Sequence, residues 1–212
     1  HHVKVGFSVD QILPYTQQPS DFQQFWQQQV DEARKLPLQY TKEPFPEFDT
    51  DRVVCYKVKL TVDRQHHALY AYLMMPRDAQ PGSCPVVLTP PGAGVKSIKQ
   101  ARERSYFQEK GVIRLVTEIH GLDPTLPQTT FDDLSHAFGN YLEMGLESRD
   151  NYYMRHVYIG LVRCIDLLTS LPEWDGRNVI TQGGSQGGAL ALIAAALDER
   201  VNLCVANHPA LS

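Results

Sequence analysis

The sequence has few cysteines, no long apolar run and no strong excess of either charge. Its four cysteines show no C-x-x-C spacing, which argues against a disulfide framework or a metal site and favours buried free thiols. The net charge of −4 provides no basic surface for nucleic acid or for an anionic membrane. No apolar run is long enough to span a bilayer. What remains is the composition of a globular protein, and it leaves the compartment open.

The length of 212 residues suits a single domain with one sizeable core. Residues 1–19 are polar and contain two prolines, so we expect an extended lead-in segment. His1 and His2 have the form of an expression-tag remnant and are left out of the site. The domain itself is predicted to occupy residues 20–212.

The first half of the domain is predicted to hold a helix and a hairpin. A capping box at residues 20–23 opens the helix, which runs to about residue 35, and a proline-rich extended connection follows. Strands are expected over 52–62 and 68–75, with a polar turn between them, so they form an antiparallel hairpin. We interpret His66 and His67 near its tip as solvated, because no partner stands at metal-ligand spacing.

From residue 85 onward, strands and helices alternate. We expect strands over 86–88, 112–119, 179–181 and 201–206, and helices over 100–110, 151–171 and 189–197. Asp150 is expected to cap the second of these helices. The third is apolar on every side and is therefore expected to be buried. This alternation predicts a mainly parallel sheet covered on both faces, with ligands at the carboxyl ends of its strands. The stretch 121–150, with a short helix over 131–144, is interpreted as a partial lid or pocket wall over that end; the alternative is a surface excursion.

The stretch around Ser185 carries the chemistry. Gly183-x-Ser185-x-Gly187 lies between a β-branched strand and an apolar helix, which is the order of a nucleophile elbow. So sharp a turn holds the serine in a strained backbone conformation, and side chains at the flanking glycines would clash. The helix N-terminus then faces the serine, so the Gln186 N–H can donate to an oxyanion. We favour this reading over a glycine-rich turn with an incidental serine.

A second loop of small residues, 90–94, follows the first core strand. It is not a phosphate loop, which needs glycine directly before the lysine, and Ser97 occupies the third glycine position of a dinucleotide fingerprint. In a hydrolase this loop supplies the second oxyanion N–H. Ala93 is the expected donor, and Gly92 beside it is expected to line the substrate pocket.

The partners of the serine are harder to find. In α/β-hydrolases an acid and then a histidine follow the serine along the chain. Asp198 and Glu199 are predicted at the amino ends of the strands, away from the chemistry, and His208 has no evident acid to orient it. We interpret His208, together with His120 at the end of its own strand, as a pocket residue.

These features resemble the acetyl xylan esterase and cephalosporin C deacetylase family, carbohydrate esterase family seven, on the α/β-hydrolase fold. The likeness covers residues 21–212 and is carried by the helix start at 21–26, the tyrosine-rich helix start at 151–158, the Ser-Gln-Gly-Gly motif within 183–188 and its continuation over 189–201. It implies a doubly wound, mostly parallel sheet preceded by an antiparallel hairpin.

The resemblance also implies a function. The expected enzyme is a serine esterase that removes acetyl groups from carbohydrate through an acyl-enzyme at Ser185, with backbone N–H groups of Gln186 and Ala93 holding the oxyanion. It implies that the enzyme needs no metal or cofactor. It also implies that the protein forms ring-like homo-oligomers. At residues 120–122 this chain has His-Gly-Leu where the family has Arg-Gly-Gln, which is expected to alter local packing and substrate choice. The family's aspartate and histidine would lie beyond Ser212, so we expect a C-terminally incomplete domain that lacks the last strands.

Two alternatives stay open. A prolyl-oligopeptidase-like peptidase uses a similar elbow, but it typically carries an upstream β-propeller, and no propeller sequence precedes the elbow here. A hydrolase-fold protein without catalytic activity would bind carbohydrate or a partner through the retained pocket. This second alternative is open because the triad acid and base are not identified in the sequence.

Overall fold

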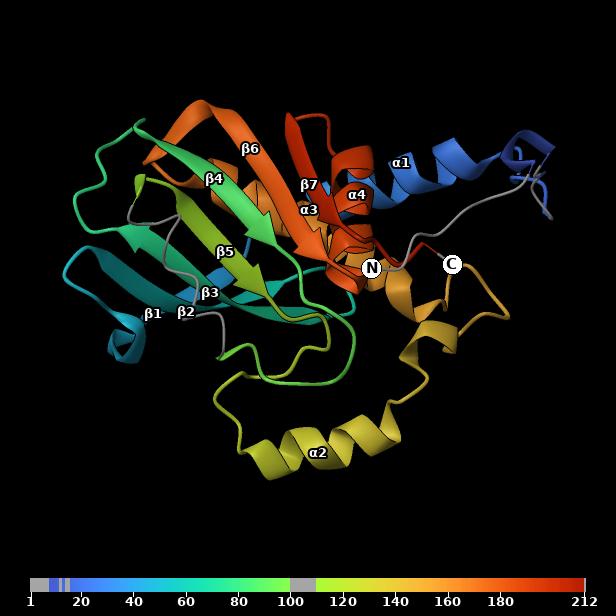
Figure 1. Ribbon diagram of the computed structural model, residues 1–212, viewed down its shortest axis with the longest axis horizontal. Coiled ribbons are helices and arrows are strands. Elements are labelled where there is room, and N and C mark those ends of the chain that lie inside the picture. Colours follow the sequence, from blue (N-terminus) through green and yellow to red (C-terminus); the bar gives the residue numbers. More distant parts are fainter. Residues whose placement is uncertain (1–7, 12, 14–15, 100–109, 212) are drawn as a thin grey trace.

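The computed structural model describes residues 8–11, 13, 16–99 and 110–211. It contains a seven-stranded mixed sheet in the order β1-β2-β3-β5-β4-β6-β7 (Figure 1). Strands β1, β2, β3 and β5 pair antiparallel, whereas β5, β4, β6 and β7 pair parallel. The strands are β1 Tyr40–Pro44, β2 Val53–Thr61, β3 Ala68–Pro76, β4 Cys84–Thr89, β5 Ile113–Thr117, β6 Trp174–Gly184 and β7 Leu203–Asn207.

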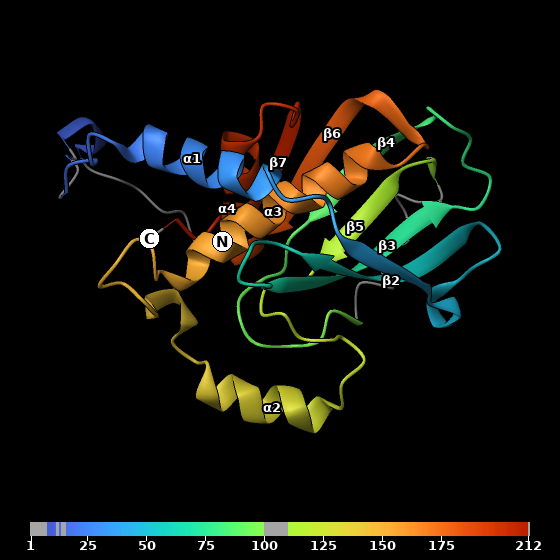
Figure 2. The same cartoon turned by 180° about the vertical axis from the view of Figure 1, so that it is seen from behind.

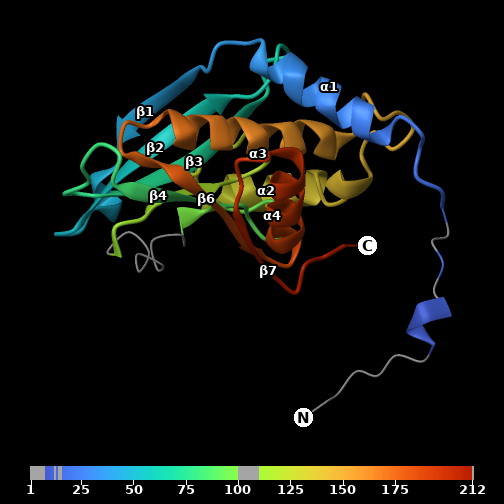
Figure 3. The ribbon, with the colours of Figure 1, turned by 90° about the horizontal axis from the view of Figure 1, so that it is seen from above.

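Three helices pack on one face of this sheet. Helix α3 crosses β4 and β6, and α1 and α4 lie beside it (Figures 2 and 3). The fully buried Val157, Leu161 and Ile165 of α3 join the main core, because they share one stripe of the helix. The helices are α1 Phe22–Arg34, α2 Gln128–Ala137, α3 Tyr153–Ser170 and α4 Gln186–Leu197, with short 3-10 turns η1 Val9–Gln11, η2 Pro46–Phe48 and η4 Tyr141–Glu143.

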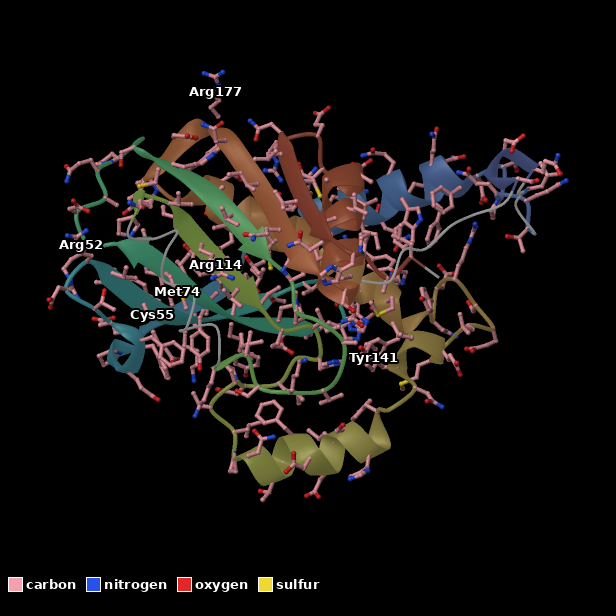
Figure 4. The ribbon with its side chains drawn as sticks, viewed as in Figure 1. Arg52, Cys55, Met74, Arg114, Tyr141 and Arg177 are labelled. Atoms are coloured by element: carbon pink, nitrogen blue, oxygen red, sulfur yellow. The ribbon has the colours of Figure 1, made fainter. Side chains whose placement is uncertain are left out.

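The opposite face of the sheet carries a smaller cluster. The rings of Phe48 and Tyr72 meet there at 4.7 Å between centroids, and Cys55 and Met74 belong to the same cluster (Figure 4). The helix expected over 100–110 falls almost entirely outside the described residues. Coverage of both faces by helices therefore stays a prediction.

The predicted hairpin and free thiols are confirmed. Strands β2 and β3 pair antiparallel from Val53–Pro76 to Thr61–Ala68. The free cysteines are Cys55, Cys84 and Cys164, which are buried, and Cys204, which is half-buried. Among the described residues, no three histidine, cysteine or acidic side chains come together as a metal site. No helix in the same part of the chain is long and apolar enough to cross a membrane.

Both expected helix caps are wrong. Helix α1 begins at Phe22 after Asp21, without the side-chain capping bond expected at residues 20–23. The Asp21 carboxylate instead accepts a hydrogen bond of 2.6 Å from Arg149. Helix α3 begins after Tyr152 rather than at Asp150, because the Tyr152 N–H bonds to the Ser148 carbonyl and closes a turn before the helix.

Three further expectations need correction. The proline-rich connection contains β1, an edge strand that pairs with β2 and tolerates Pro44 at its end. Helix α4 is buried on every side only over residues 186–191, and its second half has an exposed side, where Leu192 is 38% exposed. The helix expected over 131–144 is divided into α2 and the short turn η4.

A cluster of charges ties α1, α3 and α4 together at the amino ends of the parallel strands. The Asp198 side chain is 1% exposed and accepts hydrogen bonds from Arg34 at 2.7 Å and Arg200 at 2.6 Å. Burial alone would raise the pKa of Asp198, but hydrogen bonds and charge from Arg200, with the charge of Arg34, lower it below the usual value. This carboxylate therefore stabilises the fold as an anion.

Replacing Asp198 with alanine is expected to lower the free energy of unfolding by about 2 kcal/mol at neutral pH. The two arginine side chains are 36% and 33% exposed, so water takes over part of the lost interaction. Urea unfolding measures the change, and Glu199→Ala, at the exposed neighbouring acid, is the matched control. Equal losses in the two variants would contradict a specific role for the buried carboxylate.

Candidate active site

The turn between β6 and α4 holds Ser185 in an unusual backbone conformation. Its φ is 56° and its ψ is −126°, a region that non-glycine residues rarely adopt. The Ser185 carbonyl accepts the N–H groups of Gly188 and Ala189 at 2.9 and 3.1 Å, which starts α4. The Ser185 N–H donates to the Asn207 carbonyl at 3.0 Å, which ties the turn to the end of β7. The predicted strained strand-to-helix turn is therefore present, with its serine exposed.

The glycines around Ser185 leave no room for side chains. A Cβ at Gly183 would lie 2.1 Å from the Gly187 carbonyl oxygen, and one at Gly187 would lie 2.7 Å from that of Pro90. These distances confirm the expected clash on both sides of the serine. They also show that the loop 90–94 packs directly against the first turn of α4.

A cavity of about 360 Å³ opens beside this turn. Its lining residues are Thr89, Pro90, Gly92, Gln182, Gly183, Gly184, Asn207 and His208. The structure thus brings Gly92 and His208 together next to the residue that precedes the serine. Ala93, the expected oxyanion donor, is exposed and follows Gly92 directly.

The positions of the acid and base that would activate Ser185 remain a prediction. Both are expected beyond Ser212, and Ser212 itself lies outside the described residues. Asp198, the first acid after the serine, is bound to Arg34 and Arg200 at the amino ends of the parallel strands. The carboxylate is therefore engaged away from the serine turn, as predicted from its place between α4 and β7.

Gln186 and the loop 90–94 are joined through Tyr141, which lies in the long stretch before α3. The Tyr141 hydroxyl donates to Gln186 Oε1 at 2.5 Å and accepts the Gly94 N–H at 3.1 Å. Tyr141 lies at the end of the sheet toward which β4, β5 and β6 point, opposite Arg177 (Figure 4). The contact places part of the stretch 121–150 against the serine turn, but none of its residues lines the cavity of about 360 Å³, so its role as a partial lid or pocket wall stays a prediction. No local pattern in the sequence singles out Tyr141.

His120 occupies a different position from Gly92 and His208. It lines a second hollow of about 480 Å³, together with His67, Tyr153 and His156 among others. Its Nδ1 lies 2.8 Å from the Tyr153 hydroxyl, and its ring meets Tyr141 edge-on at 4.8 Å between centroids. Burial lowers the pKa of His120, while the Gly94 backbone acts in the opposite direction. His120 therefore lies beside Tyr141 and the Gly94 backbone, and it does not line the cavity of about 360 Å³ next to the serine turn.

A buried acid fixes the backbone at residues 120–122. The Glu118 carboxylate accepts the N–H groups of Tyr70, His120 and Leu122 at 2.7, 2.5 and 3.2 Å. Burial raises the pKa of Glu118 to about 7, and these backbone donors oppose the rise. Glu118 was not predicted as part of the site, although an acid inside the apolar strand expected over 112–119 was a readable signal.

The second hollow contains a stacked pair of histidines. His67, expected to be solvated, has its ring 4.6 Å from that of His156 with an interplanar angle of 16°. Its Nδ1 also lies 2.7 Å from Asp63 Oδ2. One face of the His67 ring is therefore packed on His156 of α3, but 43% of the His67 side chain stays exposed, and His66 is exposed as well, as expected for solvated residues.

Acidification is expected to destabilise the fold through His156. Burial lowers its pKa to about 4, His67 and Arg155 add to this, and Asp63 opposes it. The unfolded chain protonates near pH 6.5, so stability is complete above that pH and is lost as pH falls toward 4. Between pH 7 and 5.5 the expected loss is about 1 kcal/mol.

Urea unfolding of the parent and of His156→Gln at the two pH values measures this effect as a difference. The comparison is needed because Glu118, with its raised pKa, titrates in the same range with the opposite sign. His136→Gln, at an exposed histidine of α2, should keep the parental pH dependence. An unchanged pH dependence in His156→Gln would rule out this explanation.

Comparison with known proteins places this geometry in a family. A family model described as acetyl xylan esterase (AXE1) matches residues 7–212. An acetyl esterase, Axe7A of Xylanibacter ruminicola, is 52% identical over 215 residues and covers 100% of this chain. The chain spans 48% of that relative, about half its length.

Solved structures share the fold. The acetyl xylan esterase of Paenibacillus sp. R4 superposes with a TM-score of 0.78 at 23% identity, over 92% of this chain and 61% of its own. Acetyl xylan esterase 1 of Thermoanaerobacterium sp. gives 0.77 at 22% identity, over 92% and 60%. These likenesses establish the α/β-hydrolase fold, and the family model shows to which family the chain belongs. The chain belongs to the acetyl xylan esterase family.

Proposed function

We propose that the protein is a serine carboxylesterase that removes acetyl groups from acetylated carbohydrate through an acyl-enzyme at Ser185. The observation that carries the proposal is the strained, exposed Ser185 between β6 and α4, where the flanking glycines leave room only for backbone. A serine held in this way projects its hydroxyl beyond the sheet, where an ester can reach it. The family and the acetyl esterase of X. ruminicola support acetyl esters as the substrate class.

In the proposed reaction, Ser185 Oγ attacks the acetyl carbonyl and gives a tetrahedral intermediate. The N–H groups of Gln186 and Ala93 hold the oxyanion. The Gln186 N–H is available because the first N–H groups of a helix have no acceptor within it, and Ala93 contributes its N–H from the loop 90–94. Collapse breaks the bond to the sugar oxygen, which takes the proton that the serine gave up and leaves as the sugar hydroxyl, so that acetyl-Ser185 remains. Water then attacks this ester and releases acetate.

The proposal includes a histidine base oriented by an acid, as in other serine hydrolases. Among the described residues His208 is the histidine that lines the cavity beside Gly184, and we assign it, with Gly92, to the substrate pocket. The base and its acid are assigned to the sequence that follows Ser212. The reaction needs no metal or cofactor. Assembly into a homo-oligomer is part of the proposal on the family resemblance alone.

The test is acetate release from acetylated xylooligosaccharides by the full natural protein, followed by proton NMR. We expect free acetate and intact xylose chains, with p-nitrophenyl acetate also hydrolysed. A proline-containing chromogenic peptide should not be cleaved. Peptide cleavage would favour the peptidase alternative, and oligosaccharide binding without acetate release would favour a binding protein.

A further inference from the structure

The hydroxyl of Tyr141 lies between the two backbone segments that are expected to bind the oxyanion. It donates to the Gln186 side chain at 2.5 Å and accepts the Gly94 N–H at 3.1 Å. Gln186 is itself one expected donor, and Gly94 directly follows the other, Ala93. Tyr141 is 4% exposed, so its hydroxyl makes these bonds away from bulk water. One buried side chain thus contacts both sides of the proposed oxyanion hole.

On the loop side, this contact restrains a flexible backbone. Gly94 has a φ of 103°, and Gly92 stands two residues before it, so the loop has more conformational freedom than most. The bond from the Gly94 N–H fixes the peptide plane between Ala93 and Gly94. That limits rotation about the Ala93 backbone and hence the direction of the Ala93 N–H.

On the helix side, the contact accounts for a buried glutamine. Gln186 is buried, and its Nε2 has no hydrogen-bond partner among the described residues. An unsatisfied buried amide destabilises a fold, so packing alone does not explain this side chain. Its Oε1 is the acceptor for Tyr141, and the bond holds the first residue of α4 in place.

Tyr141 is itself held from the other side. The ring of His120 meets it edge-on, and the Tyr153 hydroxyl at the start of α3 lies 2.8 Å from His120 Nδ1. The Tyr141 and Tyr153 rings lie 5.9 Å apart between centroids. These contacts fix the Tyr141 ring against the body of the domain.

We propose that Tyr141 is a positioning residue that keeps the two oxyanion N–H groups at a fixed separation. The inference rests on the proposed function. An oxyanion is bound well only when both donors lie about 2.7–3.1 Å from it, and loss of one donor costs about 10²–10³ in kcat. Loss of the Tyr141 hydroxyl loosens both donors without removing either. The expected cost is therefore smaller, about tenfold to hundredfold in kcat.

The experiment compares Tyr141→Phe with the parent in the full natural protein. We expect kcat for acetyl ester hydrolysis to fall about tenfold to hundredfold, with KM within about twofold, because ground-state binding does not need the oxyanion hole. Methylboronic acid, which forms a tetrahedral adduct with an active serine, should lose affinity by the same factor as kcat/KM. Tyr158→Phe is the matched control: it removes a hydroxyl from α3 where the ring packs on Trp26, and it should leave kcat unchanged.

A second variant approaches the contact from its other side. Gln186→Met removes the Oε1 acceptor and keeps the backbone N–H, so it should lower kcat by a similar factor. The double variant should lose little more than either single variant, because both act through one contact. This pair also covers the case in which Tyr141→Phe folds poorly.

The outcomes separate the two proposals. An active parent whose turnover disappears in Ser185→Ala, together with unchanged kcat in both Tyr141→Phe and Gln186→Met, overturns the positioning role alone. Equal losses in Tyr141→Phe and Tyr158→Phe, or additive losses in the double variant, overturn it as well. A parent without turnover that depends on Ser185 overturns the proposed function, and the positioning role with it.

Discussion

Replacing Ser185 with alanine is expected to lower kcat for acetyl ester hydrolysis by about 10⁴-fold or more. The expectation follows from the backbone at the turn. A φ of 56° and ψ of −126° at a residue with a side chain are costly, and the surrounding glycines and hydrogen bonds maintain them at Ser185. Without Oγ no acyl-enzyme forms, and the remaining rate comes from binding and the oxyanion donors alone.

The measurement is p-nitrophenyl acetate and acetylated-oligosaccharide turnover by the full natural protein, its Ser185→Ala variant and Ser170→Ala. The last is the matched control, since Ser170 Oγ bonds to the Leu167 carbonyl at the end of α3 and takes no part in the turn. Equal rates in the parent and Ser185→Ala would show that another group attacks the ester. Turnover by residues 1–212 alone that depends on Ser185 would place the base within them, and His208→Ala should then abolish it.

The serine turn was predictable because its causes are local. Gly183 and Gly187 lie where a side chain would clash with backbone atoms, and the strand and helix on either side are predicted by their composition. A few consecutive residues were enough to predict the order of elements and the strained serine. The same holds for the hairpin of β2 and β3, which are neighbours in sequence as well as in space.

The errors arose where distant residues decide the outcome. The cap expected at residues 20–23 is absent, and Asp21, which stands at the N-cap of α1, is paired with Arg149, 128 positions away in the sequence. Tyr141 became part of the site only because a long irregular stretch folds back against Gln186 and Gly94. No periodicity marks such contacts, and a tyrosine in an irregular stretch has many possible partners. The hydrogen bonds that join Gly94, Tyr141 and Gln186 could therefore be found only in the structure.

Replacing Gly183 with alanine is expected to lower the free energy of unfolding by about 3 kcal/mol or more and to remove most of the activity. The new Cβ would lie 2.1 Å from the Gly187 carbonyl oxygen and 2.9 Å from the Gly188 nitrogen. Both are backbone atoms of the first turn of α4, which cannot change rotamer to make room. Relief requires the start of the helix to move, and with it Ser185 and the Gln186 N–H.

The neighbouring glycine provides the matched control. A Cβ at Gly184 would have no neighbour closer than 3.9 Å, at Asn207, which is an ordinary contact, and Gly184 is not in the positive-φ region. We therefore expect Gly184→Ala to change stability by less than about 1 kcal/mol, as for a substitution that creates no clash. Urea unfolding and esterase turnover of the two variants measure the contrast. Similar stability for both would mean that β6 and α4 are not packed as tightly as the structure shows. The two substitutions add the same methyl group at adjacent positions and differ only in the atoms that the methyl group meets. A large loss confined to Gly183→Ala would therefore show that contact between the backbones of β6 and α4 holds the serine in its strained position.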